Sequence, residues 1–156
     1  MKSIYIPGVP DTKMRHRTTK RGHVYDPNAA NKEASIQKAR LFVGDMTPYH
    51  GPLYVSFIFI FPRPKSHYGT GKNANVLKPH SPEYCDQVPK DVDNMEKFYC
   101  DSFNCIHYPD DKQIIKSETF KRYASGRDEM PHVWMSIYRV PSEAVIDERG
   151  TVTLLK

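Results

Sequence analysis

Four acidic residues and one lysine in the middle of the chain have types and spacing that suit metal-assisted chemistry. Asp91 and Asp93 stand two residues apart where a helix is expected to begin, and Lys97 follows one turn later. Asp110 and Asp111 come just past the end of that helix, ahead of a new apolar run. Mg²⁺ prefers hard oxygen ligands such as carboxylates, together with waters and substrate phosphates. We interpret these residues as a candidate divalent-metal site.

Such a site would suit hydrolysis of a phosphodiester. If the carboxylates converge, a bound cation relieves their mutual repulsion and lets all of them stay ionised. The metal would polarise the phosphodiester and generate a hydroxide. Lys97 would stabilise the extra negative charge of the transition state, or orient the attacking water.

The same residues also admit purely structural interpretations. Asp93 followed by Glu96 resembles a capping box, so Asp93 would only cap the helix. Lys97 would only form an ion pair with Asp93 or Asp101, one turn away on either side. The pair Asp110-Asp111 would be an ordinary turn after a proline.

Convergence of the acids also depends on how the helix packs. A helix of about a dozen residues is roughly 18 Å long. The link over residues 104–110 is therefore too short to retrace it. The acids would meet if the helix packs obliquely, or if the sheet or a second subunit approaches Asp110 and Asp111.

A basic stretch over residues 13–23 is the second candidate for function. It holds five formal positive charges, two histidines and no acid. The five cations are Lys13, Arg15, Arg17, Lys20 and Arg21. An exposed loop or ribbon of this kind fits phosphate contact, which releases counterions from DNA, although a merely solvated basic loop has the same composition. The net charge of +5 favours a polyanionic partner without identifying one.

The elements that would position these residues follow from hydrophobic periodicity. Residues 93–103 predict a helix, because Met95, Phe98, Tyr99, Ser102 and Phe103 form one stripe. Residues 32–43 predict a structural helix with Gly44 as its cap. Residues 53–61 predict a central strand covered on both sides, since both of its faces are largely apolar. Shorter strands are expected at 3–6, 113–120, 133–138 and near 151–154.

The segment 65–89 reads as a long loop, rich in Lys, Ser, His, Gly, Asn and Pro. A loop of this length in a compact domain is usually functional or mobile. It would either close over a substrate or stay disordered in the absence of DNA.

These elements predict one small α/β (α+β) domain over residues 1–156, with a mixed sheet of four to five strands packed with two main helices. No apolar run approaches 18 residues, so no membrane span is expected. The N-terminus lacks the apolar stretch of a signal peptide, and the three cysteines form no CxxC pair. We therefore expect an intracellular, cytoplasmic protein with reduced thiols. The seven scattered histidines predict no structural zinc site.

The acidic stretch resembles the signature of a known family. Asp91-Val92-Asp93-Asn94-Met95-Glu96-Lys97, then Asp101, then Asp110-Asp111-Lys112-Gln113-Ile114, is similar to the motif of RusA-type Holliday junction resolvases. The core of the match covers residues 90–116, and the preceding order of strand, basic loop, helix and apolar strand also agrees. The chain departs from the family at Lys90, where a proline often precedes the first acid, and at Cys105, where a glycine commonly follows the helix.

The resemblance implies a homodimer that uses Mg²⁺ or Mn²⁺ to make paired, symmetric nicks in four-way DNA junctions during recombination and repair. It implies that Asp91, Asp93 and Asp111 bind the metal, with Asp110 as the less certain member of its pair. It implies that Lys97 assists catalysis. The basic stretch from Lys13 to Arg21 matches the family's DNA-binding surfaces by character only. Because a junction is approximately two-fold symmetric, paired cuts call for two sites related by a matching axis.

Two other functions remain open from the sequence. One is a nuclease of the same fold that acts on other branched DNA, such as forks or flaps. The other is a non-catalytic, basic DNA-binding module, in which the acids serve only as caps and salt-bridge partners. Substitution of Asp91 or Asp93 by Asn separates the enzyme from the module, because only an enzyme has cleavage to lose.

Overall fold

A mixed four-stranded sheet forms the centre of the molecule. The computed structural model describes residues 1–43, 47–141 and 144–154. Its strands lie in the order β1 (Lys2–Pro7), β6 (His132–Arg139), β4 (Leu53–Phe61) and β5 (Ile114–Tyr123). Neighbouring strands are antiparallel except β4 and β5, which are parallel. The parallel pair requires a crossover connection, and that connection contains the candidate site.

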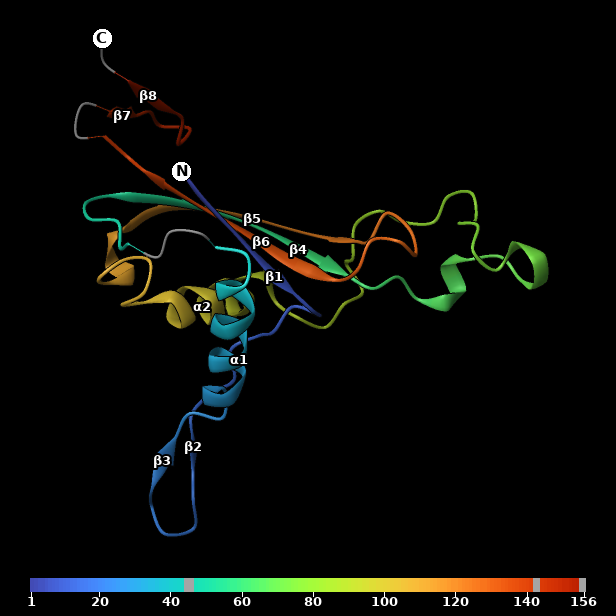
Figure 1. The fold of residues 1–156 in the computed structure, drawn as a ribbon, viewed down its shortest axis with the longest axis horizontal. Helices are drawn as coiled ribbons and strands as arrows, with labels where there is room; N and C mark the ends of the chain where they lie inside the picture. The colour runs from blue at the N-terminus through green and yellow to red at the C-terminus, as the bar shows by residue number, and fades with distance from the viewer. Residues whose placement is uncertain (44–46, 142–143, 155–156) are drawn as a thin grey trace.

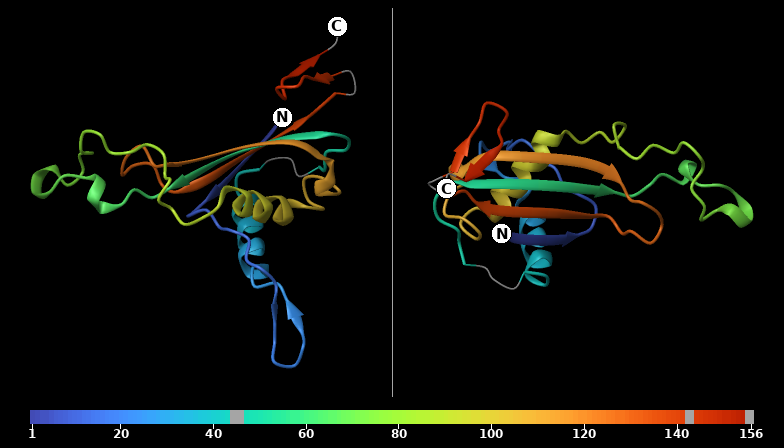
Figure 2. Two further views of the ribbon diagram at one scale, coloured as in Figure 1. Left: turned by 180° about the vertical axis from the view of Figure 1, so that it is seen from behind. Right: turned by 90° about the horizontal axis from the view of Figure 1, so that it is seen from above.

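Two helices pack on one face of this sheet (Figures 1 and 2). They are α1 (Ala29–Arg40) and α2 (Val92–Phe103). The stripe predicted for α2 is confirmed, because Met95, Phe98, Tyr99, Ser102 and Phe103 are all buried. Helix α1 begins at Ala29 rather than Lys32 and ends at Arg40 rather than Val43, while the expected cap Gly44 lies outside the described residues. The predicted α+β class, a mixed sheet with two helices, is confirmed.

The opposite face of the sheet carries no helix among the described elements (Figure 2). Ile58 of β4 pairs in register with Trp134 on one side and Phe120 on the other. These three side chains are 40%, 41% and 62% exposed. The expectation that β4 is covered on both sides is therefore wrong. On the second face of β4, Ile58 lies in a row of apolar side chains that runs across three strands on an open surface. The periodicity of a single strand does not show that its neighbours form such a row.

The basic stretch forms a small hairpin that projects from the core (Figure 1). Its strands are β2 (Arg17–Thr18) and β3 (Val24–Tyr25), and we call residues 13–26 the basic hairpin. Its base is held against α2, where the Lys13 amide donates to the Asn94 carbonyl at 2.9 Å. A second pair of short strands, β7 (Ala144–Ile146) and β8 (Val152–Leu154), follows the sheet.

The connection from β4 to α2 runs out from the end of the sheet as an arm, residues 62–89 (Figure 2). It contains two short 3-10 helices, η1 (Lys65–His67) and η2 (Gly71–Asn73), as expected of a loop without long elements. No described helix is both long enough and apolar enough to cross a bilayer.

Candidate active site on helix α2

Helix α2 begins with an exposed carboxylate that its own backbone does not use. Asp91 is the N-cap residue, with extended backbone angles, and its side chain makes no capping hydrogen bond. Among the described residues, its carboxylate accepts a hydrogen bond from the Asn94 side-chain amide, at 3.4 Å. A negative charge at this end also interacts favourably with the helix dipole. The fold therefore leaves the Asp91 oxygens available to a ligand.

The capping box expected at Asp93 and Glu96 is not formed. Glu96 reaches across to the sheet, where its carboxylate accepts a hydrogen bond from the Thr119 hydroxyl of β5 at 2.8 Å. Asp93 lies in the first turn of α2 and not at its cap. The structural interpretation of Asp93 as a cap is therefore wrong.

Asp93 and Lys97 form an exposed ion pair along α2. The Lys97 ammonium lies 3.4 Å from an Asp93 carboxylate oxygen, and the two side chains are 61% and 65% exposed. A pair of this kind contributes only about 0.3–0.5 kcal/mol to stability. Both groups can therefore exchange this contact for a ligand at little cost to the fold.

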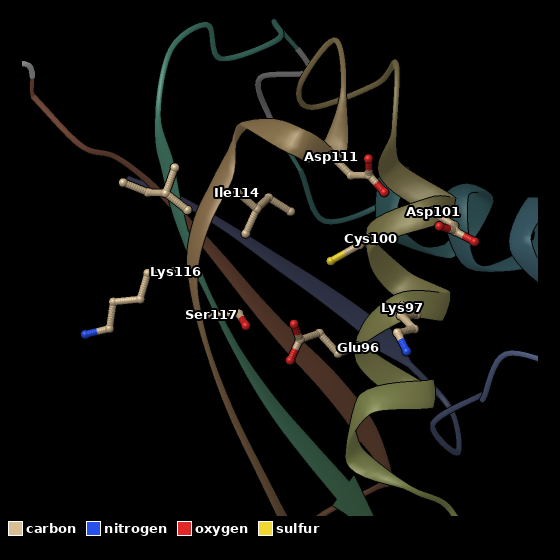
Figure 3. A pocket seen from close by; sticks show the side chains of 9 residues that line it. Glu96, Lys97, Cys100, Asp101, Asp111, Ile114, Lys116 and Ser117 are labelled. Atoms are coloured by element: carbon tan, nitrogen blue, oxygen red, sulfur yellow. The ribbon is translucent and has the colours of Figure 1, made fainter. Parts of the chain in front are cut away.

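A pocket of about 280 Å³ opens between α2 and β5 (Figure 3). Its lining residues are Glu96, Lys97, Cys100, Asp101, Asp111, Ile114, Ile115, Lys116 and Ser117. Figure 3 shows the Glu96 side chain pointing into the space between the helix and β5, and Asp111 near the end of α2 that carries Asp101. We call this the acidic pocket, because three carboxylates line it.

Asp101 has a structural role. Its carboxylate forms ion pairs with Lys13 at 2.7 Å and Lys32 at 3.4 Å. Lys32 in turn pairs with Asp26 at 2.9 Å, and this hydrogen bond lowers the pKa of Asp26. These contacts tie α2 to α1 and to the base of the basic hairpin.

The adjacent acids Asp110 and Asp111 differ in their partners. Asp110 caps the 3-10 helix η3 (Asp111–Gln113): it accepts from the Lys112 amide at 3.0 Å, and its own amide donates to the Gln113 side chain at 3.2 Å. It also pairs with the Lys112 ammonium at 2.9 Å, a hydrogen bond that lowers the Asp110 pKa. Asp111 is exposed and turns into the acidic pocket. The structural turn expected at this pair is thus formed by Asp110, whereas the exposed Asp111 lines the acidic pocket.

Asp111 and the acids at the start of α2 lie toward opposite ends of the helix. Strand β5 runs beside α2 in the reverse direction, so that Ile114 lies by Cys100 in the pocket. Further along β5, Lys121 donates to the carbonyls of Val88 and Lys90, at 3.2 and 3.0 Å, just before Asp91. Cys100 lies seven positions after Asp93, a rise of about 10 Å along the helix axis. The link after α2 does not retrace the helix.

This arrangement bears directly on the predicted metal site. Asp91, Asp93 and Asp111 supply the carboxylate oxygens that Mg²⁺ prefers. In residues 1–43, 47–141 and 144–154, however, no three His, Cys, Asp or Glu side chains are grouped closely enough to hold a metal ion. The donors suit the metal in kind, but one chain alone does not bring them together.

Two other reactive side chains are packed into the fold. Burial raises the pKa of the Cys100 thiol to about 12, so it is not a thiolate nucleophile at neutral pH. His107 is fully buried and packs against Phe103 with ring centroids 5.3 Å apart. Glu96 and Ser117 are among the pocket residues that sequence reasoning did not select as site residues. Glu96 stands beside the apolar stripe, which was a signal that it faces the sheet.

The cations of the basic hairpin separate into two groups. Arg15, Arg17, Lys20 and Arg21 are exposed. Lys13, at the base, is engaged with Asp101. A second cavity at this base is lined by Lys13, Met14, Arg15, His16, Asn94 and Lys97. Lys97 therefore lines both this basic cavity and the acidic pocket.

Comparison with known proteins agrees with this geometry. A family model described as endodeoxyribonuclease RusA matches residues 7–136, which include the basic hairpin, the arm, α2 and the acidic pocket. No curated protein matches the chain.

Proposed function

Because the chain belongs to the RusA endodeoxyribonuclease family, we propose that it is a metal-dependent endonuclease that resolves four-way DNA junctions by paired nicks, in recombination and repair. The observation that carries the proposal is the position of Lys97. Its side chain lines a cavity with the hairpin cations on one side and a pocket with Asp111 on the other. A DNA strand bound to the hairpin would thus pass beside the acids.

The residues of α2 then have distinct tasks. Asp91, Asp93 and Asp111 would hold Mg²⁺ or Mn²⁺, which when bound supplies a hydroxide and polarises the phosphodiester. Lys97 would place its ammonium beside the scissile phosphate and stabilise the negative charge that develops there. Arg15, Arg17, Lys20 and Arg21 would bind phosphates of the junction arms. Asp110 would position Asp111 by capping η3.

The separation of the acids supports a homodimer. Strand β5 lies at the edge of the sheet, where Arg122 near its C-terminal end forms a β-bridge with Tyr84 of the arm. The rest of such an edge strand can pair with another copy. Antiparallel pairing of β5 with its copy about a two-fold axis would set the Ile114 end of one strand opposite the Tyr123 end of the other. The start of α2 lies beside that second end, since Lys121 contacts Lys90. Asp91 of the partner subunit would then approach Asp111, and both sites would face the same side of the joined sheet.

A cleavage assay with a labelled synthetic junction tests the function. The protein is incubated with the junction or with a linear duplex, with and without Mg²⁺, beside Asp93→Asn and the control Asp128→Asn. Asp128 is exposed in the turn between β5 and β6, outside the candidate site. We expect paired, Mg²⁺-dependent nicks in the junction from the wild type and the control. Asp93→Asn should bind the junction and lose cleavage by at least about a hundredfold.

Two outcomes contradict the proposal. Junction binding without cleavage in either Mg²⁺ or Mn²⁺ indicates a non-catalytic DNA-binding module. Equal or faster cleavage of forks and flaps, tested alongside, assigns the enzyme to other branched DNA.

A further inference from the structure

The outer part of the arm, residues 65–80, is a second basic element. It carries Lys65, Lys72 and Lys78 with two histidines and has no Asp or Glu. All three lysines are exposed. Such a one-sided set of positive charges favours a polyanionic partner.

Contacts within the arm give it a defined shape. Tyr68 and Leu77 form a β-bridge, and the Gly69 amide donates to the Val76 carbonyl at 3.0 Å. The two limbs approach so closely that a Cβ on Gly69 would lie 2.7 Å from the Asn73 carbonyl oxygen. The arm therefore presents its lysines on a folded ribbon, and less conformational entropy is lost when a ligand binds.

Arg127, from the turn between β5 and β6, fixes the arm to the sheet. Its guanidinium donates to the Ala74 carbonyl at 2.9 Å and lies 4.4 Å from the centre of the Tyr68 ring. Arg63, at the start of the arm, donates to the Ala124 carbonyl just after β5 and to the Pro82 carbonyl, the latter at 2.7 Å. Two arginines are thus used to hold the arm in place, while the lysines remain exposed.

Among the described residues, no carboxylate neutralises the positive charges of the three arm lysines. Within the part of the chain that the structure describes, the ammonium groups of Lys65 and Lys72 form no ion pair or hydrogen bond. Among the described residues, the Lys78 ammonium donates to the neutral Ser66 carbonyl, at 2.8 Å, and pairs with no carboxylate. The ligand that would compensate them is a polyanion with several phosphates.

The arm and the basic hairpin meet at the first turn of α2. Lys90 directly follows the arm, and its ammonium donates to the Pro10 carbonyl just before the hairpin. The hairpin base is bonded to Asn94 through the Lys13 amide. Figures 1 and 2 show that the two basic elements then leave the core in different directions. Asp91 and Asp93 lie where these two elements meet.

We propose that the outer arm is a second phosphate-binding element, which holds the duplex of a branched DNA on the side of α2 opposite the basic hairpin. The inference rests on the proposed function for the identity of the DNA. It adds that Lys65, Lys72 and Lys78 contribute to affinity for the duplex but not to the chemical step.

Salt-dependent binding in the absence of catalytic metal tests the proposal. Binding of the fluorescent junction in EDTA is measured over a series of salt concentrations for the wild type and Lys65→Gln/Lys72→Gln. The charge-matched control is Lys38→Gln/Arg40→Gln, two exposed cations on the last turn of α1. Each phosphate contact contributes about 0.9 to the slope of log affinity against log salt. The arm variant should lose nearly two from the slope and bind about tenfold more weakly at low salt.

Each outcome has a defined meaning. An arm variant whose affinity and slope equal those of the wild type or fall no further than those of the control overturns the proposal, as does a wild type that shows no salt-dependent binding. Cleavage at saturating protein in Mg²⁺ is measured on the same samples. An arm variant that binds weakly but cuts at the wild-type rate when saturated supports the assignment. A wild type that binds the junction normally and never cuts it refutes the proposed nuclease activity. The binding comparison between wild type and arm variant would still test the arm proposal.

Discussion

Asp110 and Asp111 are neighbours in the chain with different surroundings. The Asp110 carboxylate is occupied by the Lys112 amide and ammonium, whereas Asp111 turns into the acidic pocket. We predict that Asp111→Asn lowers junction cleavage by at least about a hundredfold. Asp110→Asn should keep cleavage within about twofold, because asparagine still caps η3. Initial nicking rates in Mg²⁺ at saturating protein compare the two variants.

Circular dichroism and junction binding provide the control for this pair, since both variants should fold and bind DNA. If Asp110→Asn abolished cleavage as completely as Asp111→Asn, the division of roles between the two acids would be wrong. Asp110 would then have to contact the metal or the DNA directly.

Sequence reasoning identified the acids of α2, but it did not show which of them form ion pairs within the fold. Asp101 belongs to the family signature by position, yet it pairs with Lys13 and Lys32. Lys13 and Lys32 lie far from Asp101 in the chain, so residue spacing could not indicate these ion pairs. The same contact removes Lys13 from the freely exposed cations of the hairpin. Side-chain partners of this kind are set by tertiary packing, which local patterns do not encode.

At the scale of elements, hydrophobic periodicity was enough to predict which main helices and strands form and in what order. The apolar stripe of α2 and the apolar run of β4 predicted the bounds of both elements within a residue or two. The C-terminal end of α2 was less predictable. Asn104 suits a left-handed cap, but it adopts φ of −59°, and the positive φ of 62° falls on Cys105. The hydroxyl of the buried Tyr108 donates to the Cys100 carbonyl at 2.9 Å. This hydrogen bond helps fix the chain reversal after α2.

The turn between β5 and β6 contains an ion pair that gives a pH-dependent contribution to stability. Arg122 donates two hydrogen bonds to Glu129, at 2.8 and 2.9 Å, and the Ser125 amide donates to the same carboxylate. The hydrogen bonds from Arg122 lower the Glu129 pKa to about 2. The carboxylate therefore stabilises the fold above the unfolded-state pKa near 4.5, and this stabilisation is lost as pH falls toward 2.

We predict that Glu129→Gln lowers the free energy of unfolding at pH 7 by about 1–2 kcal/mol, a figure reduced for the partial exposure of the pair. The difference from wild type should shrink between pH 4.5 and 2, because both proteins then lack the charge. Urea unfolding at several pH values measures it, with Asp128→Asn as an exposed acid of the same turn. A difference that stayed constant down to pH 2 would show that the charge of Glu129 is not the stabilising feature.

At the scale of the whole molecule, the chain arranges two basic projections around one helix and leaves the acids of that helix divided. The basic hairpin and the arm meet at the first turn of α2, while Asp111 lies toward the other end. If a second copy completes each site, the two halves of the metal site come from different chains. In that case each chain would supply its own DNA-binding elements, and each catalytic site would need both chains.

Mixing two inactive variants tests this division. In Asp93→Asn every site lacks the acid from the start of α2, and in Asp111→Asn every site lacks the acid from η3. A mixed dimer would contain one site with both defects and one site with none, if each site is shared between subunits. We predict that co-refolded variants recover nicking, up to about a quarter of the wild-type rate from random pairing. Only one strand of each junction should be cut by such a dimer. Sites built within one chain would each retain a defect, and no mixture would then recover cleavage, however the chains are paired.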